Sequence, residues 1–214
     1  CTTGGNNTAI GSGANAGTTG SNNTTVGCAA GAAITTGGNN TAMGHNALEN
    51  NTTGSDNTAI GQDCMFTNTT GSNNVALGEN ALYYNNANEN TALGKTAMQE
   101  NTSGTLNTAL GARTLDANTS GSYNTSVGTQ SLFSITTGDT NVAVGINALY
   151  AVTGSNNNTG VGPDAGQSVT TGANNTFLGH DAGRSASPSG NVTTGSNIIC
   201  LGDNSVSDLY CADT

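Results

Sequence analysis

NTAIG, at residues 57–61, is a pentapeptide that this chain repeats with small changes along almost its whole length. The same five residues stand at 7–11, and close copies are NTAMG at 40–44, NTALG at 90–94 and NVAVG at 141–145. Successive copies lie 16 or 17 residues apart, except for a last step of 23. Their final glycines are Gly11, Gly27, Gly44, Gly61, Gly78, Gly94, Gly111, Gly128, Gly145, Gly162, Gly179 and Gly202. A regular internal period therefore organises the sequence.

The length of this period favours one architecture. Seventeen residues are too few for a helical-hairpin repeat and do not fit heptads. Each unit holds two short apolar stretches between corners rich in Gly and Asn, which is typical of two or three short strands per coil. We expect an all-β fold, a parallel β-solenoid of about twelve 17-residue coils over residues 1–202, with an insertion within 180–195 and a tail at 203–214. Stacked coils lie about 4.8 Å apart, so the rod should be roughly 55 Å long.

An asparagine stands four residues before the repeat glycine in eleven of the twelve copies. Its side-chain carbonyl and amide can bond to equivalent groups on the coils above and below, so we predict a structural ladder at a corner of the coil. Ile198 takes this position in the last copy. The predicted ladder consists of Asn7, Asn23, Asn40, Asn57, Asn74, Asn90, Asn107, Asn124, Asn141, Asn158 and Asn175.

Two apolar columns stand side by side before each repeat glycine. The residue directly before the glycine is always aliphatic or Met, and the residue two before it is Ala in most copies. Because successive side chains of a strand point to opposite faces, the two columns cannot both fill the same interior. One column should fill the coil and the other should pack against a partner chain. We therefore expect a homo-oligomer, most simply a homotrimer of three rods around one axis.

Three units carry a resemblance to a known class of proteins. TTGSDNTAIGQDCM at 52–65, TTGSNNVALGENAL at 69–82 and TSGTLNTALGARTL at 102–115 resemble repeats of bacteriophage tail-fibre proteins, and more distantly the head repeats of trimeric autotransporter adhesins. NIICLGDNSVSDLYCADT, at 197–214, resembles the segment that leads into a C-terminal intramolecular chaperone domain of many phage fibres. The resemblance implies homotrimeric, surface-exposed proteins that serve in attachment.

Three functions are compatible with this pattern. The first is a structural shaft or adhesive segment of a phage tail fibre, located in the virion, with other fibre or baseplate proteins and a host glycan or protein as partners. The second is the head of a bacterial surface adhesin, located outside the cell or on its surface. The third is an ice-binding solenoid, because Thr recurs three residues before the repeat glycine, although Val75 and Val142 interrupt that column.

Aromatic residues mark the candidate ligand contacts. Phe66 and Tyr83 stand five residues after the repeat glycine in consecutive copies, and Phe133 and Tyr150 form a second such pair. Aromatic faces commonly stack on sugars, but the same rings also suit structural packing or a chain interface. A second candidate is Arg184, within the six-residue insertion.

The overall charge and hydropathy exclude two classes of function. Only 7% of the residues are charged and the net charge is −10. Lys95, Arg113 and Arg184 are the only basic residues, which is too few for a nucleic-acid footprint. No apolar run approaches the roughly 18 residues that crossing a membrane requires. We expect neither nucleic-acid binding nor membrane insertion.

No constellation of residues predicts catalysis or a cofactor. His45 and His180 lie eight repeats apart and cannot share a metal or a triad within one chain. Asp63, Asp164 and Asp181 share the second position after the repeat glycine, where oxygen ligands for Ca²⁺ are conceivable, but no Asp-x-Asp-x-Asp loop is present. We interpret these acids as a solvated edge and expect no enzyme activity, no metal and no cofactor.

The five cysteines are odd in number and show no Cys-x-x-Cys spacing. Cys64 and Cys200 occupy columns otherwise held by alanine, so we expect both to be buried thiols that behave as small hydrophobic side chains. The state of Cys1 and Cys211, near the two ends, is left open by the sequence.

Overall fold

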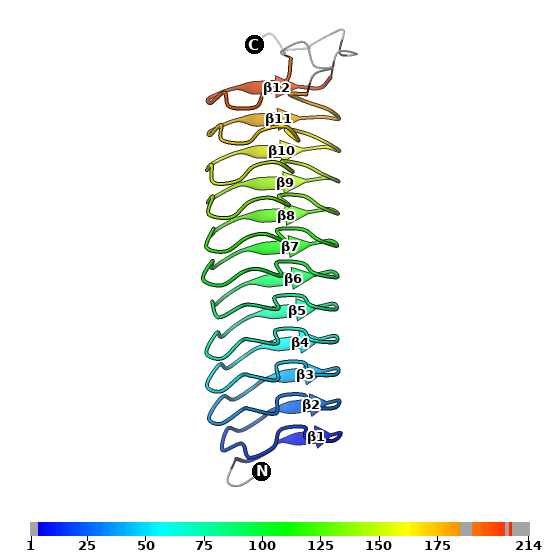
Figure 1. Ribbon diagram of the computed structural model, residues 1–214, viewed down its shortest axis with the longest axis vertical. Helices are drawn as coiled ribbons and strands as arrows, with labels where there is room; N and C mark the ends of the chain where they lie inside the picture. The colour runs from blue at the N-terminus through cyan, green and yellow to red at the C-terminus, as the bar shows by residue number, and fades with distance from the viewer. Residues whose placement is uncertain (1–3, 185–189, 204–205, 207–214) are drawn as a thin grey trace, which may run out of the picture.

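The computed structural model describes residues 4–184, 190–203 and 206, and twelve strands of three residues account for all the regular secondary structure in them. The strands follow one another along a rod, with one strand in each coil (Figure 1). They are β1 (Thr8–Ile10), β2 (Thr24–Val26), β3 (Thr41–Met43), β4 (Thr58–Ile60), β5 (Val75–Leu77), β6 (Thr91–Leu93), β7 (Thr108–Leu110), β8 (Thr125–Val127), β9 (Val142–Val144), β10 (Thr159–Val161), β11 (Thr176–Leu178) and β12 (Ile199–Leu201).

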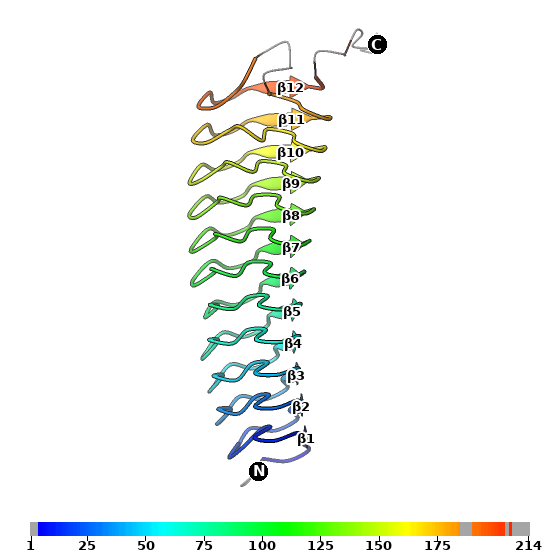
Figure 2. The ribbon, with the colours of Figure 1, turned by 45° about the vertical axis from the view of Figure 1, so that its right-hand side comes forward.

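The twelve strands form one parallel sheet in which sequence order and spatial order are the same. Equivalent residues are paired in register, so that Ala42 stands opposite Ala59 and Ala59 opposite Ala76. The view in Figure 2 shows this sheet on one side of the rod and the returning chain on the other. The predicted parallel β-solenoid with coils of about 17 residues is confirmed.

The number of strands per coil differs from the prediction. The sequence predicts two or three strands in each coil, whereas the described residues of each coil form only one. The second apolar stretch cannot extend, because the residues two and four positions after the repeat glycine have left-handed backbones, such as Asn80 with φ 57° and Leu82 with φ 51°. The alternating left-handed residues fold this stretch into a compact turn. Leu82 is nevertheless fully buried and faces the sheet from the opposite wall.

The core of the rod is narrow and consists mainly of alanine. The central residue of each strand from β2 to β12 is buried, as at Ala59, and the last residue points outward, as at Leu77. The sheet forms one wall of the rod, and the turns that follow the repeat glycines form the opposite wall. The alanine column of the sheet packs in one core with a second small residue and a buried Leu or Met of these turns, such as Ala81 and Leu82. The alanine column therefore fills the coil and the large aliphatic column lies on the surface, which answers the question that the sequence leaves open.

One coil replaces the central alanine by a phenylalanine. Phe177, in β11, is completely buried. Two glycines, Gly166 and Gly183, stand where most coils have the large residue of the opposite wall. A Cβ atom added to either glycine would lie 2.7 Å or 2.4 Å from an atom of the Phe177 ring. The larger side chain on the sheet is thus matched by smaller residues on the opposite wall, so the total volume of the core is kept.

The chain returns to the regular coil soon after the predicted insertion. Residues 185–189 lie outside the described part of the chain. Beyond them, the Val192 N–H donates to the Gly183 carbonyl (2.8 Å) and the Thr170 N–H donates to the Thr193 carbonyl (2.7 Å). Of the predicted tail at 203–214, only Asp203 and Val206 are described.

Candidate functional site

The repeated asparagine column forms a continuous hydrogen-bonded ladder inside the rod. At the Asn57 rung, the backbone N–H donates to the Asn40 Oδ1 (3.0 Å) and the side-chain Nδ2 donates to the Gly71 carbonyl of the next coil (2.8 Å). The Asn57 Oδ1 in turn accepts the N–H of Asn74 (3.0 Å). Every rung from Asn23 to Asn175 is buried. The ladder closes at Ile198, whose N–H donates to the Asn175 Oδ1 (2.9 Å).

A second buried asparagine ladder was missed by the sequence analysis. The Asn68 Nδ2 donates both to the Asn51 Oδ1 (3.0 Å) and to the Gly71 carbonyl (3.0 Å). The signal was present, since Asn stands seven residues after the repeat glycine in five consecutive copies. The Oδ1 of the last rung has no partner because Ile135 follows it in the column. The ladder consists of Asn51, Asn68, Asn85, Asn101 and Asn118.

A small cluster of hydroxyl groups replaces alanines in the core between β7 and β8. The Thr114 Oγ1 lies 2.7 Å from the Ser126 Oγ and 2.9 Å from the Ser131 Oγ, and the two serine oxygens lie 2.5 Å apart. All three residues are fully buried. Because each hydroxyl is hydrogen-bonded to the others, no buried hydroxyl of the cluster lacks a partner, and the three side chains serve as polar core packing.

The two predicted aromatic pairs stack along the rod. The ring centroids of Phe66 and Tyr83 lie 5.2 Å apart at an interplanar angle of 17°, and those of Phe133 and Tyr150 lie 5.0 Å apart at 10°. The Arg113 guanidinium covers Phe133 at 4.7 Å from the ring centroid. One face of each ring is therefore covered by its partner, and Arg113 also covers the ring of Phe133. This geometry favours the packing interpretation of the four residues.

Charged groups beside the aromatic pairs are held in local contacts. The Arg113 Nε lies 3.4 Å from an Asp116 carboxylate oxygen. Partial burial raises the pKa of Asp116, and the hydrogen bond and charge of Arg113 oppose this rise. The pKa of Tyr83 is also raised, first by desolvation and then by the nearby Tyr84 and the acids Asp63 and Glu49.

Arg184, the other predicted contact residue, is bound to acidic residues of its own chain. Its Nη1 donates to Asp181 and lies 3.5 Å from an Asp164 carboxylate oxygen. His180 adjoins this group, and the possible ligand atoms of Asp164, His180 and Asp181 lie within 4.8 Å of one another. The single positive charge of Arg184 offsets one of the two carboxylate charges of Asp164 and Asp181. Asp63 is remote from this group and accepts a hydrogen bond from Asn46 (2.9 Å).

Two of the five cysteines are placed in the core. Cys64 is buried, and burial raises the pKa of its thiol to about 12. Cys200 is buried at the centre of β12, in the alanine column. These positions fit the prediction of small hydrophobic side chains. Cys28 is exposed at the corner after β2, whereas Cys1 and Cys211 lie outside the described residues.

The described part of the rod has neither a pocket nor a helix that could span a membrane. No pocket forms among these residues, and they include no helix of the length and hydropathy needed to cross a membrane. Searches against protein-family models, curated proteins and solved structures found no match to this chain.

Proposed function

We propose that this chain is a stiff shaft segment of an attachment fibre, such as a phage tail fibre, in which identical copies associate through their sheets. The observation that carries the proposal is a column of aliphatic side chains on the outer face of the sheet, exposed in eight of the twelve strands and partly exposed in the other four. The wider assignment to a phage fibre draws on the resemblance of the repeats. A bacterial adhesin head would share the same assembly and differ in its location.

The outer sheet face is apolar at the same position of every strand. The last residue of all twelve strands is Ile, Val, Met or Leu. These side chains lie on the surface, with Ile10 60% and Leu77 48% exposed. Contiguous apolar surface of this kind is unusual on a monomer and commonly marks a protein interface.

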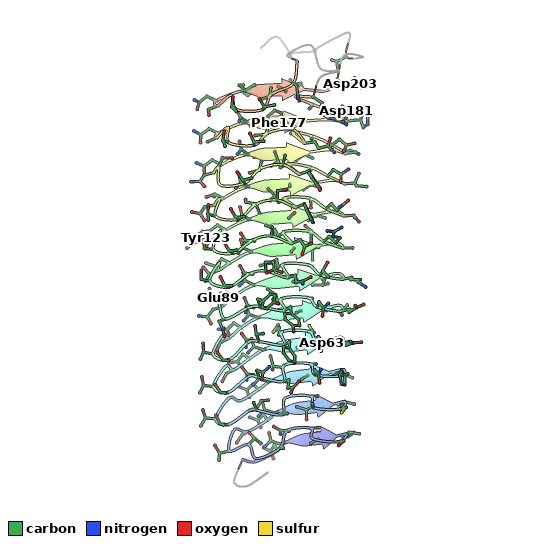
Figure 3. The ribbon with its side chains drawn as sticks, in the orientation of Figure 1. Asp63, Glu89, Tyr123, Phe177, Asp181 and Asp203 are labelled. Atoms are coloured by element: carbon green, nitrogen blue, oxygen red, sulfur yellow. The ribbon has the colours of Figure 1, made fainter. Side chains whose placement is uncertain are left out.

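The same face carries no charge. None of the twelve strands contains a charged residue, and the acids lie outside the strands, as Asp63 does (Figure 3). A chain with a net charge of −10 repels its own copies, so an uncharged face is where two copies can meet at the lowest electrostatic cost. A second copy is therefore the occupant that fits this face best.

The dimensions of the face are sufficient for association. Twelve strands at about 4.8 Å and three residues at about 3.3 Å give a face of roughly 55 by 10 Å, or about 550 Å² per copy. Two such faces in contact cover roughly 1,100 Å², at the lower end of specific interfaces. A second rod also has the same spacing between its rows, so its side chains can interlock over the full length. The resemblance to trimeric fibres favours three copies.

Placing two negative charges on this face should dissociate the assembly. In the double variant Leu77→Glu, Leu93→Glu, neighbouring strands β5 and β6 each carry a carboxylate where copies would meet. We expect sedimentation equilibrium to give a multiple of 20.9 kDa for the native protein and a single chain for the variant. Far-UV circular dichroism should stay unchanged, since both side chains point away from the core.

The matched control adds the same charge at an exposed corner. Asn73 and Asn157 occupy a corner column in which Glu89 occurs naturally, so Asn73→Glu, Asn157→Glu should keep the native mass. A native protein that sediments as a single chain at all concentrations would contradict the proposed assembly. Equal dissociation of the control would attribute the effect to net charge instead of to the sheet face.

A second function is favoured by one further observation on the same face. The first residue of nine strands is Thr, so Thr and aliphatic rows alternate on a flat, exposed sheet, and such rows suit an ice surface. If the face binds ice, the isolated rod should show thermal hysteresis, and Leu77→Glu, Leu93→Glu should reduce it. Hysteresis equal to that of an unrelated acidic protein at the same concentration would exclude this function.

A further inference from the structure

One corner of the rod is an exposed column that is usually asparagine. This column stands five residues before the repeat glycine and has left-handed backbones throughout, with φ 57° at Asn39 and 60° at Asn157. Asparagine tolerates this conformation better than most residues. Its side chain also bonds along the column, as where the Asn22 Nδ2 donates to the Asn39 Oδ1 (3.1 Å) and the Asn157 Nδ2 to the Asn174 Oδ1 (3.0 Å).

Two consecutive coils replace this asparagine by large apolar residues. Leu106 has φ 58° and Tyr123 has φ 61°, a conformation that is unfavourable for bulky side chains. Burial repays this strain for Leu82 in the core, but Leu106 is 43% exposed and Tyr123 59% exposed. Neither residue continues the hydrogen-bonded column. Backbone strain that no buried contact offsets is a reason to look for a functional role.

The ring of Tyr123 differs from the other aromatic rings described above. Tyr83 stacks on Phe66, and Tyr84 packs edge-on against Tyr83 with ring centroids 4.6 Å apart. Tyr123 makes no ring contact within the described part of the chain. Figure 3 shows its side chain at the outer edge of the rod, on the same edge as Glu89. Neither face of the Tyr123 ring is therefore covered by another ring, whereas each ring of the stacked pairs has one face covered by its partner.

Polar groups flank the apolar pair in the same column. Glu89 stands one coil before Leu106, and Thr140 stands one coil after Tyr123. The four residues, which we call the Tyr123 corner, present a carboxylate, an alkyl group, an aromatic ring and a hydroxyl in a row. Three coil steps of about 4.8 Å give this row a length of roughly 14 Å.

We propose that the Tyr123 corner binds an uncharged oligosaccharide that lies along the rod. The C–H face of a sugar ring packs on the tyrosine, while the Glu89 carboxylate and the Thr140 hydroxyl bond to the hydroxyl groups of neighbouring sugars. This contact goes beyond the shaft function and holds whether or not copies associate.

Charge and size distinguish this ligand from other classes. The corner contains a carboxylate and no cation, and Lys95 and Arg113 are paired with Glu79 (2.9 Å) and Asp116 (3.4 Å), so an anionic polysaccharide is disfavoured. A protein interface ordinarily needs about 20–30 residues on each side, far more than one convex edge provides. A row of alternating polar and apolar groups fits a neutral glycan.

The test exploits the fact that asparagine is the usual residue of this column. The native protein and Tyr123→Asn are applied to an array of immobilised glucose, mannose, galactose and N-acetylglucosamine oligomers. We expect the native protein to bind at least one neutral oligomer, and Tyr123→Asn to bind it about tenfold more weakly or worse. The urea midpoint of the variant should be equal to or higher than that of the native protein, because Asn relieves the backbone strain.

Two control variants make the result specific. Tyr84→Asn removes another exposed tyrosine, at a position where a different coil has Asn50, and should retain binding. Tyr123→Phe keeps the ring and should also retain most of the binding. The proposal is overturned if the native protein binds no neutral oligomer, if Tyr123→Asn binds equally well, or if Tyr84→Asn loses binding to the same extent. Sedimentation of each variant separates these outcomes from any failure of the assembly.

Discussion

Replacing Asn158 with alanine should lower the free energy of unfolding by roughly 2–6 kcal/mol, because two buried backbone groups lose their partners at about 1–3 kcal/mol each. The Asn158 Nδ2 donates to the Gly172 carbonyl (2.9 Å), and its Oδ1 accepts the Asn175 N–H (3.1 Å). Alanine can make neither bond, and because Asn158 is fully buried, bulk solvent does not reach these groups in the native rod. Urea unfolding followed by far-UV circular dichroism measures the change.

The neighbouring asparagine provides the control for this substitution. Asn157 is exposed, has φ 60°, and its Nδ2 donates to the Asn174 Oδ1 (3.0 Å) on the surface. Asn157→Gly keeps the left-handed backbone, and water can replace the lost bond, so the change should stay below about 1 kcal/mol. Equal losses in the two variants would show that the interior ladder contributes no more than a surface amide.

Replacing Gly94 with alanine should destabilise the rod by more than about 4 kcal/mol or prevent its folding, which is among the largest effects of a single substitution. Gly94 follows β6 with φ 140°, and a Cβ atom there would lie 2.3 Å from the Gly111 carbonyl oxygen of the next coil. The three nearest atoms, from Gly111 and Ala112, are all backbone, so no side chain can move away to relieve the contact. Soluble yield and urea unfolding measure this effect.

Gly154 is the matched control, since it also lies in the middle of the rod. Its backbone lies outside the left-handed region, and the nearest atom to an added Cβ is the Thr137 Oγ1, at 3.0 Å. That hydroxyl can rotate, so Gly154→Ala should change stability by about 1 kcal/mol or less, and the stiffer unfolded chain favours a gain. A similar loss in both variants would contradict the proposed role of close coil stacking at Gly94.

The period of the repeat glycine was sufficient to predict the fold, because stacking makes each position of the coil a column with one environment. The role of a single column could therefore be predicted from the type of residue that recurs in it, as for the buried ladder that contains Asn57. The backbone conformation within a coil was harder to predict from the sequence. Ala81 and Leu82 look like part of a strand, and only their backbones show that left-handed residues turn the chain there.

Interactions that involve two columns were the hardest to foresee. The large Phe177 is accommodated by Gly166 and Gly183 on the opposite wall, and this exchange depends on which coils stack against each other. The candidate site was missed for a related reason. A search for aromatic residues in consecutive coils finds the stacked pairs, whereas Tyr123 stands out only as a departure from an asparagine column.

The simple order of the sheet determines how the rod would respond to force. Each strand contacts only the strand before it and the strand after it, so tension along the axis passes through every coil in series. A folded coil spans about 4.8 Å of the rod axis. When it detaches and extends, its 17 residues span roughly 55–60 Å. The rod would therefore unfold one coil at a time and dissipate mechanical work, while the remaining coils stay folded.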